Sequence, residues 1–192
     1  MLRKFIVFIA VTTLLVSCTF LQQIGKQTVE ALNIRNCSFN LDGLESINIA
    51  GVNCKNLKSL TLSDVFKITS CLAAKQLPIN LGVNVGASNP SDKDASVSKM
   101  LWACSIDDQD LANGSTSEAF RIPAQGSTII PISVNADAFN IFSSTGIDAV
   151  RSFIGTITDD KTITNRLAVK VKPTIEMGAS TVTLPYIQLA HN

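Results

Sequence analysis

The clearest hydrophobic pattern in the chain lies just before its middle. Apolar residues alternate there with asparagine and glycine, at Ile79, Leu81, Val83 and Val85. A period of two residues places these side chains on one face only if the chain is an extended strand. Asn89-Pro90 follows, and proline lacks an N–H for a sheet ladder and restricts the residue before it. The pattern predicts a half-buried strand that ends in a turn at Asn89-Pro90.

Further strand-like segments follow at short intervals. They are residues 99–106, 119–122 and 129–134, and they are separated by turn-rich residues 108–114 and 124–126. Short turns join antiparallel neighbours. Together with the first strand, these segments predict an antiparallel meander.

Strand patterns also occur nearer both ends of the chain. Residues 34–41 and 46–54 alternate, and Asp42-Gly43 between them is a hairpin signal. Residues 166–171 and 181–189 are the last predicted strands. Pro185 interrupts the second of these, which is typical of a sheet edge.

Helical spacing is confined to two segments. Ser63-Asp64 is expected to cap a helix that runs to Gln76, and a second helical stretch covers residues 136–154, where Gly146 divides it. Because short turns join most of the strands, the expected fold is mainly β. We expect an antiparallel β-sandwich with two or three connecting helices, in one domain over residues 33–192.

Several short motifs occur in order in the second half of the chain. They are Asn-Pro at 89–90, IDDQDLANG at 106–114, IPAQGSTIIPISV at 122–134, VKPTIEMG at 171–178 and Leu-Pro at 184–185. From about Leu77 to Leu189 this order resembles the late-embryogenesis-abundant type 2 family, also called the water-stress and hypersensitive-response domain. The resemblance implies an immunoglobulin-like or fibronectin-like β-sandwich. Ser91 stands where the family often has a second asparagine, and serine also suits a turn.

The first residues are typical of an export signal. Arg3 and Lys4 precede an apolar run over residues 5–16, which is too short to cross a bilayer core of about 30 Å. The segment Leu15-Val16-Ser17-Cys18 resembles the bacterial lipobox, in which the cysteine is acylated after cleavage. An ordinary signal peptide with a chance cysteine is the alternative. We expect a signal peptide over residues 1–17 and a lipidated N-terminus and linker over residues 18–32.

These features predict attachment to a membrane through the lipid on Cys18. More than one acyl chain gives a stable anchor without a membrane-spanning segment. No acidic residue follows directly after Cys18, which by analogy with bacterial lipoproteins favours the outer membrane, facing the periplasm. The formal net charge is +1, so nothing in the charge balance indicates a nucleic-acid partner. An apolar ligand or an envelope protein is a possible further partner, and the oligomeric state is left open.

Candidate catalytic and metal-binding residues are few. The one histidine, His191, lies next to the C-terminus, which disfavours a catalytic triad or a histidine-containing zinc site. Asp107, Asp108 and Asp110 invite a calcium interpretation, but the spacing fails the EF-hand register. A solvated turn is preferred there, with an irregular calcium site as the alternative. We expect no catalytic residue, no metal and no cofactor.

Once Cys18 carries lipid, four cysteines remain: Cys37, Cys54, Cys71 and Cys104. Their apolar surroundings favour buried free thiols. An exported protein can oxidise its thiols, so one or two disulfides, or a metal site, are the alternatives. Trp102 is expected in the core or on a sheet face.

The sequence therefore predicts a non-catalytic, membrane-anchored lipoprotein of the bacterial cell envelope. The family resemblance implies a protective or stress-related role. The alternative is a periplasmic binding protein or carrier for lipid or another apolar ligand. A carrier needs an elongated apolar cavity, which a closely packed sandwich lacks, so the interior of the fold separates the two.

Overall fold

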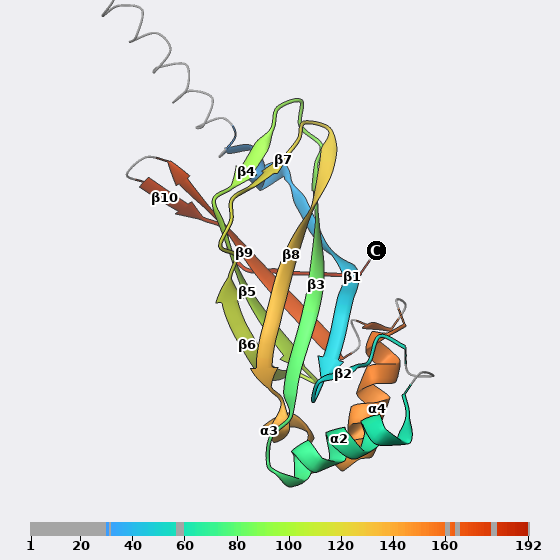
Figure 1. Cartoon of the computed structure of the whole chain (residues 1–192). Helices are drawn as coiled ribbons and strands as arrows, with labels where there is room; N and C mark the ends of the chain where they lie inside the picture. Colours follow the sequence, from blue (N-terminus) through green and yellow to red (C-terminus); the bar gives the residue numbers. More distant parts are fainter. Residues whose placement is uncertain are drawn as a thin grey trace, which may run out of the picture.

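The computed structural model describes residues 30, 32–56, 60–159, 162–163, 166–177 and 180–191. Within these residues the protein is mainly β, with antiparallel sheets, three α-helices and a short 3-10 helix. Figure 1 shows two larger sheets lying face to face, with the α-helices gathered at one end and a small two-stranded sheet toward the other.

The first sheet has the strand order β2-β1-β3-β8. Its strands are β1 (Ser38–Ile49), β2 (Val52–Asn53), β3 (Pro78–Asn89) and β8 (Gly126–Asp137). At the centre lies β3, in which every second side chain from Ile79 to Asn89 is buried. The strand predicted from the alternation is therefore confirmed, and it ends at Asn89 as the Asn-Pro pair indicated.

The predicted hairpin at Asp42-Gly43 is wrong. β1 continues through both residues and pairs with β3, with shifts of register between Leu41 and Ser46. Gly43 has a φ of 97°, a conformation that glycine adopts at low cost where a strand bulges. The chain reverses instead at Ala50-Gly51, where φ is 54° and 73°. The long pairing with β3 buries a whole strand face, and this outweighs a local turn signal.

The second sheet has the order β10-β9-β5-β6, and β11 also pairs with β9. Its strands are β5 (Lys99–Ile106), β6 (Gln109–Ser115), β9 (Leu167–Met177), β10 (Ser180–Thr183) and β11 (Ile187–Gln188). Pro185 separates β10 from β11, so the predicted interruption is confirmed. The N–H of Leu184 still donates to the carbonyl of Pro173 at 3.0 Å. This bond holds the segment between β10 and β11 against β9.

The predicted meander is wrong, although each of its strands exists. β3 pairs with β8 in the first sheet, β5 with β6 in the second, and β7 (Phe120–Ile122) with β4 (Ala95–Val97) in the two-stranded sheet. Apolar alternation shows which face of a strand is buried but not which strand lies beside it. Which strands pair is decided when the two sheets pack against each other around one core.

The turn-rich interpretation of residues 108–114 is also wrong. The turn consists of Asp107 and Asp108 alone, with φ of 50° and 62°, and β6 begins at Gln109. β6 is an edge strand whose side chains are half-buried or exposed, so its sequence lacks the alternation of a strand with one buried face.

Both predicted helical segments are confirmed, with different ends. α2 (Leu62–Ala73) starts after Thr61, whose hydroxyl accepts from the N–H of Asp64 while the Asp64 carboxylate accepts from the N–H of Thr61. The cap therefore lies before the expected Ser63-Asp64.

The second predicted helical stretch is divided at Gly146, which has a φ of 69°, into α3 (Phe139–Phe142) and α4 (Gly146–Ile157). It begins later than expected because β8 continues to Asp137. Ile34–Asn36 forms the 3-10 helix η1 where a strand was expected.

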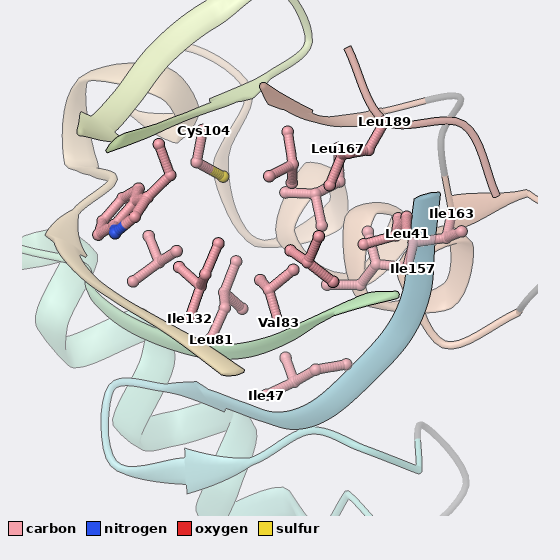
Figure 2. Close-up of a cluster of buried hydrophobic side chains, with 14 of the residues drawn as sticks. Leu41, Ile47, Leu81, Val83, Cys104, Ile132, Ile157, Ile163, Leu167 and Leu189 are labelled. Atoms are coloured by element: carbon pink, nitrogen blue, oxygen red, sulfur yellow. The ribbon is translucent and has the colours of Figure 1, made fainter. Parts of the chain in front are cut away.

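The core fills the space between the two larger sheets. Figure 2 shows Leu81, Val83 and Ile132 of the first sheet pointing toward Cys104 and Leu167 of the second. Each of these side chains is at most 2% exposed. At about 25 cal/mol per Å² of apolar area removed from water, this shared core is the main stabilising contribution to the fold.

Candidate functional site

The predicted lipidation site, Cys18, lies outside the described residues, as do the signal peptide and nearly all of the linker. Lipidation of Cys18 therefore stays a prediction. In the part of the chain that the structure describes, no helix is both long enough and apolar enough to span a bilayer.

The domain begins close to one end of the sheets. The side-chain amide of Asn33 donates to the carbonyls of Lys93 and Asp94, both at 3.2 Å. Lys93 and Asp94 lie in the loop before β4, at the opposite end of the molecule from α2 (Figure 1). These contacts fix the point at which any preceding anchor segment enters the domain.

Asn89 organises the same loop from inside. It is one of the few buried polar residues, at 1% exposed, and its amide donates to the carbonyls of Lys93 at 2.8 Å and Ile122 at 3.2 Å. Its side-chain oxygen accepts from the N–H of Ser91 at 3.0 Å. The Asn-Pro pair is therefore more than a strand end. Its asparagine supplies buried hydrogen bonds that hold β3, β7 and the loop together.

Asp94 makes a second set of contacts at this end. Its carboxylate accepts from the N–H of Ala124 at 2.9 Å, and it forms an ion pair with Arg121 of β7. Neither Asn33 nor Asp94 stands out in the sequence as a functional or structural motif. The only local signal was the Asn-Pro-Ser run, which is typical of an Asx turn and is consistent with the bond from Ser91 to Asn89.

The turn at Asp107 and Asp108, for which calcium binding was considered, takes part in an ion pair. Asp107 pairs with Arg166, whose Nε donates to the Asp107 Oδ1 at 2.7 Å. The guanidinium holds the pKa of Asp107 below its ordinary value, and the carboxylate raises the pKa of Arg166. Asp108 and Asp110 are exposed. Within the described residues, no group of three or more histidine, cysteine or acidic side chains is placed to hold a metal ion.

The cysteines Cys37, Cys54, Cys71 and Cys104 are free thiols in the structure, so the disulfide alternative is not realised there. Cys54 and Cys104 are buried, whereas Cys37 and Cys71 are half-buried. Burial raises the pKa of Cys104 to about 12 and that of Cys37 to about 11, because a thiolate is poorly solvated there. A thiol with so high a pKa is a poor nucleophile at neutral pH.

His191 lies in a segment that the fold holds in place. The N–H of Leu41 donates to the carbonyl of Ala190 at 2.9 Å, and Leu41 and His191 form a parallel bridge. The segment after β11 thus connects the second sheet to β1 of the first. It pairs with β1 at Leu41, a part of the strand that β2 does not pair with. His191 contributes to this connection through its backbone.

The residues that the structure describes form at least two hollows on the surface of the domain. One, of about 280 Å³, lies where β8 approaches β6 and β7, and Trp102 and Phe120 form part of its lining. The other, of about 490 Å³, lies over the outer face of the first sheet beside Asn40, Gly86 and Ile129. Trp102 itself is 7% exposed, so the expectation that it lies in the core is confirmed.

These features define a two-layer antiparallel β protein whose signature residues shape loops and turns. The family model for late embryogenesis abundant proteins matches residues 84–187, more than half of the chain. The chain therefore belongs to this family. None of the curated proteins with which the sequence was compared matches it.

Three solved structures resemble the fold at low sequence identity. A protein from Archaeoglobus fulgidus is 16% identical with a TM-score of 0.37, covering 76% of this chain and 92% of its own. A protein described as late embryogenesis abundant, solved in solution, is 12% identical with a TM-score of 0.39, covering 94% and 87%. A structural genomics target solved by X-ray crystallography is 8% identical with a TM-score of 0.37, covering 82% and 88%.

Proposed function

We propose that the protein is a non-catalytic lipoprotein of a bacterial cell envelope with a protective role under stress. The observation that carries this proposal is the family match over residues 84–187, because late embryogenesis abundant proteins are generally not enzymes and are linked to stress. We further assign the two facing sheets to an immunoglobulin-like or fibronectin-like β-sandwich, an assignment supported by the antiparallel pairing and the single shared core.

Attachment through Cys18 is part of the same proposal. The run Leu15-Val16-Ser17-Cys18 supports it, and so does the docking of Asn33 at one end of the domain. With an anchor before Asn33, the loop around Lys93 faces the membrane and α2 points away from it (Figure 1). We place the protein on the periplasmic face of the outer membrane, because no acidic residue directly follows Cys18.

A carrier of apolar ligands is less well supported. The space between the sheets is filled by side chains such as Leu81, Val83 and Leu167, each at most 2% exposed. The two hollows described above are open to solvent, and hydroxyl and amide side chains form much of their lining. An acyl chain needs a long apolar enclosure, so we keep the tethered protective protein as the leading function.

The anchor is tested by Cys18→Ser in the full chain, expressed in a bacterial host. We expect the variant to leave the membrane pellet, and the wild-type protein to carry acyl chains on Cys18 by mass spectrometry. Cys71→Ser, which removes a half-buried thiol of the domain, should stay with the membrane. A Cys18→Ser protein that remains in the pellet would refute the anchor.

The protective role needs its own measurement. A deletion strain should survive drying or osmotic shock less well than its parent. Wild-type protein should restore survival, and the Cys18→Ser variant should restore less of it. Equal survival of deletion and parent strains would refute the protective role but leave the anchor untouched.

A further inference from the structure

The hollow beside Trp102 has the features of a small ligand site. It lies where β8, the edge strand of the first sheet, approaches β6, the edge strand of the second. Trp102, Phe120, Pro131 and Ile132 supply apolar walls, and the side chains of Ser115, Ser117, Glu118 and Ser133 supply polar groups. Its volume of about 280 Å³ lies just below the usual range of ligand pockets, about 300–1,000 Å³, and suits a single ring.

Trp102 brings an unused hydrogen-bond donor to this hollow. Trp102 is only 7% exposed, yet its indole N–H forms no hydrogen bond within the part of the chain that the structure describes. Among the described residues no fully buried side-chain polar atom lacks a partner, so this unpaired N–H must be partly exposed. The hollow between β8 and β6 is an opening that Trp102 lines. A buried Trp or Tyr normally finds a partner for its polar group, so an open N–H favours a ligand that accepts from it.

The indole is fixed in position by its neighbour on β6. A Cβ built on Gly114 would lie 2.5 Å from the Trp102 Cζ2, so the ring lies directly against the glycine backbone. Gly114 and Trp102 are paired residues of the β5–β6 ladder. One face of the ring is therefore covered, and we infer that the ring offers its N–H edge to the hollow rather than a face.

This arrangement selects among classes of ligand. A ring edge that ends in an N–H is electropositive, so it disfavours the cation–π stacking that a ring face would offer. The described residues that line the hollow include Glu118 and no lysine or arginine, so an anionic ligand is disfavoured as well. The hydroxyl groups disfavour an acyl chain. What fits is a neutral ligand that has hydrogen-bonding groups and a small apolar part.

We propose that the hollow beside Trp102 binds a neutral sugar ring that carries an acetamido group. The acetamido carbonyl accepts from the Trp102 N–H, and its methyl group packs against the apolar walls formed by Phe120 and Pro131. Ring hydroxyls donate to the Glu118 carboxylate and exchange hydrogen bonds with the Ser133 hydroxyl. The proposal does not depend on the lipid anchor, since every residue in it belongs to the described domain.

The experiment exploits the single tryptophan of the chain. The full chain, held in a detergent without a sugar headgroup, is titrated with N-acetylglucosamine while the fluorescence of Trp102 is followed. We expect a saturable change with a millimolar Kd, typical of a site with few hydrogen bonds. Glucose and glucosamine, which lack the acetamido group, should bind at least about tenfold more weakly, a factor that corresponds to one lost interaction.

Matched variants locate the site. Ser133→Leu should fill the hollow and abolish the fluorescence change, whereas Ser127→Leu, also exposed on β8, should leave it intact. Glu118→Gln keeps the fold, because the side chain is exposed, and should weaken binding several-fold. Trp102→Phe, followed by NMR instead of fluorescence, should weaken it about tenfold or more.

Three results would overturn the proposal: no saturable change with N-acetylglucosamine, equal binding of glucose or glucosamine, or equal loss in Ser133→Leu and Ser127→Leu. Membrane fractionation of the same protein reports the lipid anchor separately.

Discussion

Arg166 and Asp107 lie 59 residues apart in sequence and form a two-point hydrogen-bonded ion pair at the end of the molecule that carries the helices. The Arg166 guanidinium also lies 5.4 Å from the ring centroid of Phe153 and donates to the hydroxyl of Ser152 at 3.3 Å. One side chain thus connects the β5–β6 turn, α4 and the segment that leads into β9.

This pair should make stability depend on pH in the acid range. The pKa of Asp107 is lower in the folded protein than in the unfolded chain, so the stabilisation is present above the unfolded pKa. It is lost as the pH falls through the folded pKa. Because the pair is partly exposed, Asp107→Asn should lower the free energy of unfolding at pH 7 by only about 1 kcal/mol. Denaturant titrations should show this difference shrinking toward pH 2.

The control for this prediction is Asp148→Asn. Asp148 pairs with Arg151 one helical turn away at 3.4 Å and is exposed, so its loss should change stability by less than about 0.5 kcal/mol. A difference between Asp107→Asn and wild type that stays constant down to pH 2 would contradict the electrostatic explanation.

Asp108 should be a site where glycine stabilises the protein. Its φ is 62°, and the two-residue turn that it forms with Asp107 favours an Asp-Gly sequence. Asp108→Gly relieves the backbone strain and should raise the free energy of unfolding by about 0.5 kcal/mol, after the entropy cost of glycine. Asp110→Gly lies within β6 and should destabilise instead. Melting curves of both variants check the signs, and a lower melting temperature for Asp108→Gly would be the contrary outcome.

The family's asparagine should matter for stability through its side chain. Asn89→Ala removes three hydrogen bonds in a largely buried site, those to the Ser91 N–H and to the carbonyls of Lys93 and Ile122. Of these groups, the Lys93 carbonyl keeps a second bond, from Asn33. We expect a loss of about 2–3 kcal/mol. Asn84→Ala, on the half-exposed outer face of the same strand, should stay within about 0.5 kcal/mol of wild type. Equal effects of the two variants in urea titrations would rule out a special role for Asn89.

The thiols should differ in reactivity in a fixed order. At pH 8 a thiol with a pKa of about 11 is ionised in only about one molecule in a thousand, and one with a pKa of about 12 in about one in ten thousand. A disulfide reagent should therefore label Cys37 slowly and the buried Cys104 only after unfolding. Mass spectrometry of timed samples checks the order, with Cys71→Ser as the control. Rapid labelling of Cys104 in the native protein would mean that the second sheet opens locally.

Much of the secondary structure could be predicted from short stretches of sequence. Ile79 to Val85 identified a strand and its buried face, because a period of two residues has one physical explanation. Gly146 was correctly placed as the break between two helices, because glycine readily adopts the positive φ found there. Asn89-Pro90 was correctly placed as a strand end, because proline lacks an N–H and restricts the residue before it. The motifs between residues 89 and 185 also resembled the family that the comparison then showed.

What the sequence did not determine was which distant segments meet. Asp42-Gly43 has a sequence typical of a turn, yet it lies inside β1, because pairing with β3 buries more surface than a local reversal would. The sequence around Asp107 did not predict its ion pair with Arg166, and the sequence around Trp102 did not predict its contact with Gly114. Each contact depends on segments that only the closed fold brings together. Local patterns set the conformation of each segment. The burial of one shared core, which requires all segments at once, decided the partners and the hollow beside Trp102.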